Sequence, residues 1–250
     1  MPKFYVVSDI HGFADEMIEA LDEAGFDTND EDSWLISLGD VLDRGPQSQE
    51  VIDYLMGLPR SILLKGNHEV LMQELIEREF PYSYDWHNGT AQSVIDLASD
   101  VNTFENATIV ANNKLKPYFN KTINYFETKN YIFCHSWIPL KCNNGFPQYH
   151  PSSNDSLSFD SNWRNASDLK WQDAQWGNPF ELAEQGFLPD KTLVFGHFHT
   201  SWARYHFENK SEWGKDADFS IYYGDGYIGI DTCTAYSGKI NVLVLEDDFI

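Results

Sequence analysis

The stretch 39–46 carries side chains that could bind metal ions and phosphate together. It reads Gly-Asp-Val-Leu-Asp-Arg-Gly-Pro, so Asp40, Asp43 and Arg44 lie close along the chain. Carboxylates are ligands for hard divalent cations, and the planar guanidinium of Arg44 matches the geometry of a phosphate group. These residue types in this order indicate metal-assisted hydrolysis of a phosphoester.

Two further short segments offer similar groups. Asp9 and His11 are two positions apart, and residues i and i+2 of an extended segment share a face, so both could reach one ion. An aspartate near a histidine in a turn is more commonly a helix N-cap, so this pair alone indicates little. Asn67 and His68 stand in the segment 66–69, Gly-Asn-His-Glu. Three such groups in succession are hard to explain as ordinary turns.

Each of these groups directly follows an apolar run that predicts a buried strand. The runs are 4–7, 34–38 and 61–65, and helical patterns at 13–24 and 51–56 separate them. Strand, helix and strand in alternation predict a parallel sheet. Because ligands of open α/β sheets bind at the carboxyl ends of the strands, we expect the three groups to meet at one edge.

The remainder of the chain predicts further helices and a second sheet. We expect helices over 70–80, 86–97 and 100–120, a β-hairpin over 123–135 and a strand over 192–195. Three apolar stretches, 202–207, 227–231 and 240–245, predict a second sheet of antiparallel character.

Composition limits the class of protein. A chain of 250 residues with 42% hydrophobic residues can bury one large core. Its 39 acidic against 17 basic residues, a formal charge of −22, argue against a nucleic-acid or anionic-membrane binder, although solvated surface explains much of the excess. The three cysteines show no paired zinc-type spacing, which indicates a reducing compartment. With no run long enough for a signal peptide or membrane span, we expect a cytoplasmic protein.

Three motifs together resemble the calcineurin-like metallophosphoesterase superfamily: residues 9–12, 39–45 and 66–69. The Asp-Arg-Gly of 43–45 is similar to the branch that contains Ser/Thr protein phosphatases and symmetrical dinucleoside tetraphosphatases. The resemblance implies an α/β fold (α+β, four-layer) with a central β-sandwich of two mixed sheets flanked by helices. It also implies a single domain over 1–250.

The resemblance implies a centre of two divalent metal ions. Its ligands would be Asp9, His11, Asp40 and His199 for the first ion, and Asp40, Asn67, His135 and His197 for the second. After His135 this chain has Ser136-Trp137 where relatives have a Gly-Gly or Ala-Gly pair. Carboxylate, amide and imidazole ligands without thiolate suit Mn²⁺, with Fe and Zn²⁺ as alternatives.

The resemblance also implies catalytic roles. A hydroxide that bridges the two ions would attack the phosphorus in line. Arg44 would orient the phosphate together with Asn67, and His68 would protonate the leaving oxygen while Asp43 holds its ring. Relatives use a second arginine as a phosphate clamp. Arg164 is the candidate here, with Arg204 as the next choice.

Residues 137–190 interrupt the succession of strands and helices, and we call them the cap insertion. The insertion is rich in Asn, Ser and Pro, and we expect it to cover the site. It contains several aromatic residues: Trp137, Phe146, Tyr149, Phe159, Trp163, Trp171 and Trp176. These side chains could stack on a base or bind a peptide, or they could simply pack the insertion onto the core.

Three functions are compatible with these residues. The leading hypothesis is a phosphatase of phosphomonoesters that resembles Ser/Thr protein phosphatases, acting on a phosphorylated protein or a small phosphoester. The alternative is a symmetrical dinucleoside tetraphosphate hydrolase, and a remote alternative is a metal-binding module without catalysis. His87, His150 and His206 match no motif and are not expected to be ligands. Asp231 follows a strand and could either support a ligand histidine or serve a turn.

Overall fold

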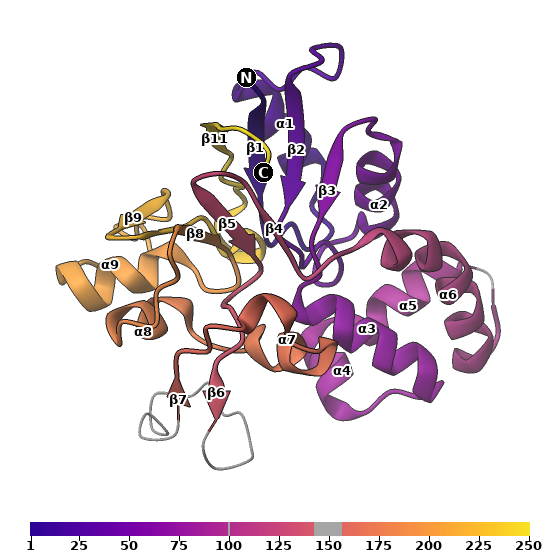
Figure 1. Cartoon of the computed structure of the whole chain (residues 1–250). Helices are drawn as coiled ribbons and strands as arrows, with labels where there is room; N and C mark the ends of the chain where they lie inside the picture. Colours follow the sequence, from indigo (N-terminus) through magenta and orange to yellow (C-terminus); the bar gives the residue numbers. More distant parts are fainter. Residues whose placement is uncertain (100, 143–156) are drawn as a thin grey trace.

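Two β-sheets packed against each other form the centre of the protein (Figure 1). The structure is a computed structural model, and it describes residues 1–99, 101–142 and 157–250. Apolar side chains of both sheets, such as Val6 and Ile36 from one and Phe133 and Val194 from the other, fill the space between them. This arrangement confirms the α/β fold with two mixed sheets and flanking helices that the sequence predicts.

The first sheet carries the three strands that precede the polar groups. Its order is β11-β1-β2-β3, with β1 (Lys3–Val7), β2 (Ser33–Ser37) and β3 (Ser61–Leu63) parallel and β11 (Leu243–Glu246) antiparallel to β1. Both faces are buried. Phe4 and Val6 point to the second sheet, whereas Tyr5 and Val7 point to α1 (Ala14–Glu23) and α2 (Ser48–Gly57). Burial on both faces explains why these strands are continuous apolar runs.

The second sheet has the order β4-β5-β8-β10-β9. Its strands are β4 (Tyr125–Glu127), β5 (Tyr131–Cys134), β8 (Thr192–Phe195), β10 (Tyr227–Gly229) and β9 (Tyr222–Gly224). The three inner strands are parallel, and the two edge strands are antiparallel to their neighbours. The hairpin predicted over 123–135 is confirmed as β4 and β5. The sheet as a whole is mixed, so the prediction of an antiparallel second sheet is wrong.

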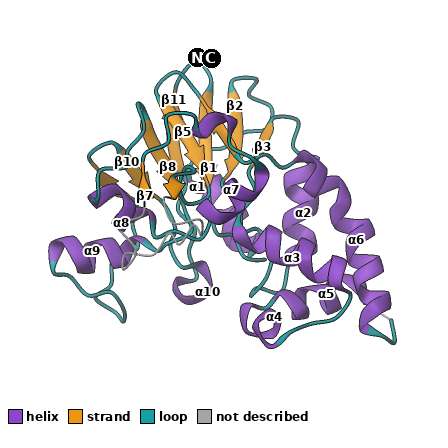
Figure 2. Ribbon diagram, turned by 60° about the horizontal axis from the view of Figure 1, so that its bottom comes forward, coloured by secondary structure: helices purple, strands orange, loops and turns teal. Residues whose placement is uncertain are grey.

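Four helices form a group beside the first sheet (Figures 1 and 2). They are α3 (Asn67–Arg78), α4 (Ser83–Asn88), α5 (Thr90–Ala98) and α6 (Phe104–Lys121). The single helix predicted over 86–97 is two helices, because Gly89 between them has a left-handed backbone with φ of 87°. Apolar residues of α3, α5 and α6 join the core under the first sheet.

The described part of the cap insertion packs on the outer face of the second sheet. It contains β6 (Lys141–Cys142), β7 (Leu157–Ser158), the 3₁₀ helix η2 (Trp163–Asn165), α7 (Asp168–Ala174) and α8 (Pro179–Glu184). Trp137, Trp163 and Trp171 are buried, and Trp171 stacks on Tyr125 of β4 with ring centroids 5.1 Å apart. Two of the aromatic residues predicted to line the cap, Phe146 and Tyr149, lie outside the described residues, as does His150.

The chain after β8 differs most from prediction. Residues 202–207 belong to helix α9 (Thr200–Glu208), not to a strand, and 240–245 supplies β11 of the first sheet. Ala203 is fully buried against the second sheet, with Trp202 and Phe207 beside it, as a helical face requires. The short helix α10 (Thr234–Ser237) follows β10.

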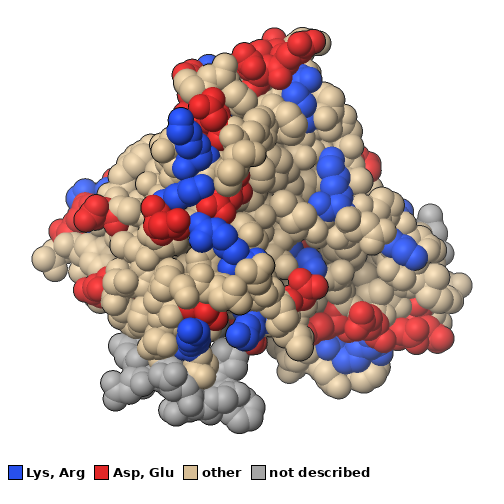
Figure 3. Space-filling view, viewed as in Figure 1, with Lys and Arg blue, Asp and Glu red and all other residues tan. Residues whose placement is uncertain are grey.

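Charged side chains of both signs are interspersed on the surface shown in Figure 3. Among the described helices, none is long and apolar enough to cross a membrane.

Candidate active site

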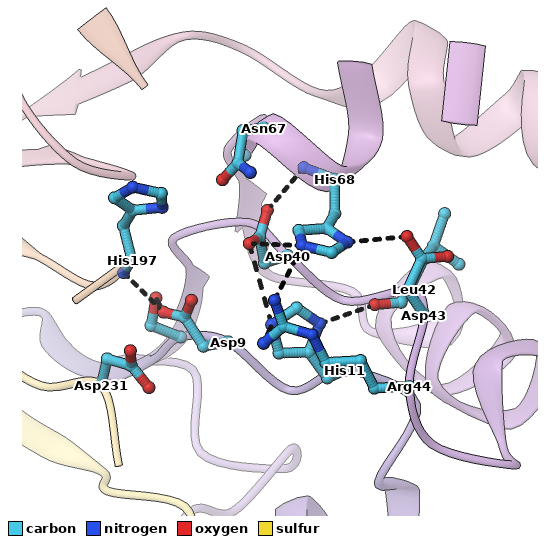
Figure 4. A network of polar contacts seen from close by, with 12 residues as sticks. Asp9, His11, Asp40, Leu42, Asp43, Arg44, Asn67, His68, His197 and Asp231 are labelled. Carbon is cyan, nitrogen blue, oxygen red and sulfur yellow. Dashed lines mark hydrogen bonds and ion pairs between the residues drawn. The ribbon is translucent and has the colours of Figure 1, made fainter. Parts of the chain in front are cut away.

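Ends of strands from both sheets bring the predicted ligands together (Figure 4). Asp9 and His11 follow β1, Asp40 follows β2, and Asn67 begins α3 after β3. From the second sheet, His135 follows β5 and His197 follows β8. Two groups of side chains have ligand atoms that all lie within 4.8 Å of one another: His11, Asp40 and His68, and Asp40, His135 and His197. Asp40 belongs to both groups.

The backbone of the site is left-handed at several positions. In the described part of the chain nine residues other than glycine have positive φ, and six of them are predicted site residues: Asp9, His11, Asp40, Asp43, Arg44 and His197. Such a conformation is costly for a residue with a Cβ atom and persists only where surrounding contacts enforce it. The strain is therefore concentrated where the polar side chains converge.

Asp40 is fixed from two directions. The buried carboxylate of Glu69 accepts hydrogen bonds from the backbone N–H groups of Asp40 (2.8 Å), Val41 (3.0 Å) and Gly66 (2.7 Å), which ties the turn after β2 to the start of α3. The backbone N–H of His68 donates to Oδ1 of Asp40 at 2.9 Å. These contacts hold the carboxylate of Asp40 at the centre of the site.

In two histidines the ring nitrogen Nε2 faces Asp40. Nδ1 of His11 donates to the carbonyl of Leu42 at 2.9 Å, and Nδ1 of His135 donates to the carbonyl of Leu38 at 3.0 Å. A carbonyl accepts only, so in the neutral rings Nε2 keeps its lone pair. Nε2 of His11 lies 3.8 Å from Oδ2 of Asp40, and Nε2 of His135 lies 3.5 Å from Oδ1.

Further ligand atoms complete the second group. Oδ1 of Asn67 lies 2.8 Å from Nε2 of His135, and Nδ1 of His197 lies 3.2 Å from the same nitrogen. Burial and, after it, the charge of His135 together lower the pKa of His197 to about 3, so His197 is neutral at physiological pH. Acceptor atoms that converge in this way fit a divalent cation, and oxygen with imidazole nitrogen suits Mn²⁺, Fe or Zn²⁺.

Asp9 is held by the loops on either side of it. Ser8 Oγ donates to its Oδ2 at 2.5 Å, the backbone N–H of His197 donates to the same oxygen at 2.8 Å, and Thr234 Oγ1 donates to its carbonyl at 2.7 Å. A Cβ atom on Gly196 would lie 1.8 Å from Ser8 Oγ, so only glycine permits this approach. The contacts join the ends of β1 and β8.

Burial and neighbouring charges act in opposite directions on the central carboxylates. Burial alone would raise the pKa of Asp40, but His135, His68 and His11 outweigh it and hold that pKa below its usual value. Burial raises the pKa of Asp9. Burial, followed by the charge of Asp40, raises the pKa of Glu69 to about 6. Asp40 is therefore the most acidic of these three carboxyl groups.

His68 and Asp43 form a hydrogen-bonded pair beside this centre. Nδ1 of His68 donates to Oδ2 of Asp43 at 2.7 Å, and Thr90 Oγ1 donates to the same oxygen at 2.7 Å. Burial tends to lower the pKa of His68, but Asp40 and Asp43 raise it, and the net shift is upward. Nε2 of His68 therefore carries a proton more readily than an ordinary histidine.

Arg44 lies across the mouth of the site. Its Nη2 is 3.1 Å from Nε2 of His68, and its Nη1 is 2.9 Å from Nε2 of His11. The side chain is exposed and contacts both His11, a predicted ligand, and His68 of the His68–Asp43 pair. A guanidinium in this place can bind an anion between them.

The structure does not bring Arg164 or Arg204 to this site. Arg164 donates to Glu127 at 2.8 and 2.9 Å and to Asp190 at 2.9 Å. Arg204 binds Ser220 at 2.8 Å and Asp218 at 3.1 Å. Carboxylates thus hold both guanidinium groups elsewhere, and the prediction of either as a phosphate clamp has no support in these contacts.

His199 also has partners outside the site. Its Nδ1 lies 2.9 Å from Ser201 Oγ, its Nε2 lies 3.6 Å from Glu212, and its ring centroid is 4.6 Å from that of Trp213. None of the contacts described for its ring involves Asp9, His11 or Asp40. Its role as a ligand of the first metal stays a prediction that these contacts do not favour.

Two residues that position the site, Glu69 and Thr90, have no predicted role. Glu69 accepts from the backbone N–H of Asp40, and Thr90 donates to the carboxylate of Asp43. Glu69 directly follows the Asn67-His68 pair, so its place in the motif is a signal for it, whereas nothing in the sequence marks Thr90. Asp231 is buried and accepts from the N–H of Cys233 at 2.6 Å, and it lies near Asp9 (Figure 4). It meets the predicted turn role through this contact.

Known proteins resemble the chain in part of its sequence and throughout its fold. Symmetrical bis(5′-nucleosyl)-tetraphosphatases of Buchnera aphidicola and Nitrosococcus oceani are 37% and 42% identical to it over 67 residues. The aligned segment is 26% of this chain and 23% of each relative, so it spans about a quarter of the curated proteins.

Solved structures match over nearly the whole chain. A protein provisionally named a diadenosine tetraphosphatase aligns with a TM-score of 0.57 at 18% identity, covering 98% of this chain and 91% of its own. The cold-active protein tyrosine phosphatase of a Shewanella species aligns with a TM-score of 0.54 at 16% identity, covering 98% and 76%. These identities show a shared fold and no more.

A family model supplies the remaining comparison. The model described as calcineurin-like phosphoesterase matches residues 2–226, which include every predicted ligand and the His68–Asp43 pair. The chain therefore belongs to the calcineurin-like phosphoesterase family.

Proposed function

We propose that this protein is a phosphoester hydrolase that uses two divalent metal ions. The observation that carries the proposal is the convergence of histidine ring nitrogens and Asp40 next to a hydrogen-bonded His68–Asp43 pair. Asp9, His11 and Asp40 would hold one ion, and Asp40, Asn67, His135 and His197 the other. Ions bound there would supply Lewis-acid stabilisation of the phosphate charge and activate a water molecule.

The chain's own residues supply binding and proton transfer. Arg44 binds the phosphate oxygens and keeps the reacting group beside His68. Nε2 of His68 gives its proton to the leaving oxygen as the bond to phosphorus breaks. Asp43, itself held by Thr90, keeps the ring in the tautomer and direction that this transfer needs and stabilises its charged form.

For the substrate, the partial relatives favour a dinucleoside tetraphosphate. The proteins that align over 67 residues are named symmetrical bis(5′-nucleosyl)-tetraphosphatases. We propose that this chain likewise hydrolyses dinucleoside polyphosphates. The sequence-based hypothesis of a protein phosphatase acting on phosphoserine or phosphothreonine stays a prediction, and the experiment below includes it.

The test compares two substrates on protein loaded with Mn²⁺. Diadenosine tetraphosphate and a phosphoserine peptide are incubated with the wild-type protein, and Asp40→Asn serves as the blank. We expect two molecules of adenosine diphosphate from the dinucleotide. Phosphate release from the peptide alone would make the protein a phosphomonoesterase. Absence of turnover on both substrates, with metal bound, would contradict the enzymatic proposal.

A further inference from the structure

The structure separates the aromatic residues of the cap insertion into two kinds. Trp137, Trp163 and Trp171 are no more than 2% exposed and belong to the core, whereas Trp176 is 50% exposed. The ring of Trp176 lies 6.4 Å from that of His197, at an angle of 85°. Among the described aromatic residues of the insertion, only Trp176 has a ring contact with a predicted metal ligand.

The backbone around Trp176 is anchored on both sides to the ends of strands that carry the site. Nε2 of Gln175 donates to the carbonyl of Lys65, just before Asn67, at 2.8 Å. On the other side, Ser136 Oγ donates to the carbonyl of Gly177 at 2.7 Å, and Ser136 directly follows His135. Figure 1 shows α7, which ends next to this segment, between the end of β5 and α3.

The indole of Trp176 is exposed although the residues on either side of it are buried. Gln175 and Gly177 are buried, so the chain enters and leaves the core within three residues and leaves only Trp176 in solvent. Exposing a large apolar side chain forgoes the free energy of its burial. A fixed, solvent-facing ring at the edge of a phosphoester site is what recognition of a flat aromatic group requires.

We propose that Trp176 stacks on a nucleobase of the substrate, an inference that rests on the proposed nucleotide hydrolase function. Every base offers a π-face, and stacking on an aromatic side chain tolerates any sequence. The charged groups at the strand ends bind the phosphates. Trp176 binds the base; it directly precedes Gly177, whose carbonyl accepts the hydrogen bond from Ser136.

The first test is kinetic. Trp176→Ala should raise the KM for diadenosine tetraphosphate by roughly 5- to 100-fold and leave kcat within about twofold, since stacking adds binding and no chemistry. Inorganic tetraphosphate, which has the same chain of phosphates without bases, should keep its KM. Trp176→Phe should restore most of the affinity. Phe159→Ala removes another exposed aromatic residue of the insertion and should leave the KM for both substrates unchanged.

The second test detects binding without turnover. Adenosine 5′-monophosphate should quench the fluorescence of the Mn²⁺-loaded wild type, and the part due to stacking should be absent from Trp176→Phe. Equal KM values for wild type and Trp176→Ala, with no quenching assigned to Trp176, would overturn this inference while hydrolysis by the wild type leaves the proposed function intact. Quenching without hydrolysis of any phosphoester would contradict the proposed function and support the stacking role.

Discussion

The chemistry of single residues depends on which partners each side chain has. His68 has a partner for each ring nitrogen, Asp43 on one side and Arg44 on the other, and it lies within 3.9 Å of Asp40. Its position therefore permits two roles, proton donor or metal ligand, and only one of these leaves metal binding intact when the ring is removed.

Replacement of His68 by asparagine distinguishes the two roles. We expect turnover to fall by about 10²- to 10⁴-fold, as for the loss of a general acid, with metal content unchanged. Asp43→Asn should produce a smaller loss in the same direction, because it disturbs only the orientation and charge of the ring. Steady-state kinetics together with metal analysis by mass spectrometry measures both quantities.

Loss of one equivalent of metal from His68→Asn would assign the ring to the centre instead. The hydrogen bond from the backbone N–H of His68 to Oδ1 of Asp40 does not involve the ring, so asparagine at this position can keep it and its loss would not explain the missing metal.

His199 makes stability depend on pH in the metal-free protein. Burial lowers its pKa to about 4, although Glu212 lies 3.6 Å away and favours the charged ring. Between pH ~6.5 and pH ~4 the unfolded chain binds a proton that the folded chain does not, so the free energy of unfolding falls as the pH falls. Urea unfolding at pH 7 and pH 5 should show a smaller decrease for His199→Asn than for wild type. An equal decrease in both proteins would contradict this account.

Residue types and order are enough to predict that these candidate ligands converge, because strands of a sheet bring their carboxyl ends together. The partners of long side chains are different. Arg164 pairs with Glu127 and Asp190, which lie 37 and 26 positions away along the chain, and no local pattern reports such contacts. Position in the chain therefore predicts Asp9 or Asn67 far better than it predicts which arginine reaches the phosphate.

At the scale of elements, the site depends on turns that approach one another closely. Gly66, between β3 and α3, lies against the turn after β2, and a Cβ atom there would be 2.2 Å from Oδ1 of Asp40 and 2.6 Å from its backbone nitrogen. The backbone φ of Gly66 is −96°, which any residue can adopt. Contact with Asp40 alone therefore excludes a side chain at this position.

Gly66→Ala should displace Asp40 and reduce both metal content and stability, by ~1–3 kcal/mol in the free energy of unfolding. Gly57→Ala at the end of α2 is the matched control. No atom lies within 4 Å of the Cβ it would add, so its stability should be unchanged or higher by ~0.4–1 kcal/mol. Metal analysis and urea unfolding of the two variants provide the comparison, and equal behaviour would contradict the steric account.

Helix α9 shows why the secondary structure of some segments is predicted wrongly from sequence. Residues 202–207 are rich in aromatic side chains, which are frequent in strands, and periodicity over six residues does not distinguish the two structures. Tertiary contacts decide the outcome, because the backbone N–H of Thr200 donates to the carbonyl of Asp231 and Ala203 packs against the second sheet. The strands of the first sheet, buried on both faces, have no such ambiguity.

At the scale of the whole molecule, the site joins the two sheets. Asp9, Asp40 and Asn67 come from the first sheet, and His135 and His197 come from the second. Ions bound among these residues would connect the two halves of the sandwich. Because only the folded chain brings these residues together, the ions would bind the folded state. Metal should therefore contribute to folding stability as well as to catalysis.

Removal of metal with a chelator should lower the midpoint of thermal unfolding. Where free metal stands at about 100 times its dissociation constant, the gain is about 2.7 kcal/mol, or roughly 5–10 °C for a chain of this size. Asp40→Asn should lose most of this dependence, since Asp40 belongs to both groups of ligands. Differential scanning calorimetry with and without Mn²⁺ measures the shift of the unfolding midpoint. Equal shifts in the wild type and in Asp40→Asn would place the bound metal elsewhere.

The left-handed residues of the site have a consequence for how this protein would change under selection. Asp9, His11, Asp40, Asp43, Arg44 and His197 hold a backbone shape that glycine adopts without cost. In a laboratory population selected only for heat resistance, glycine at these positions would relieve backbone strain, but it would also remove the side-chain hydrogen bonds and candidate ligands of the site. Selection for heat resistance therefore has to include selection for activity, because variants chosen for stability alone could lose the site.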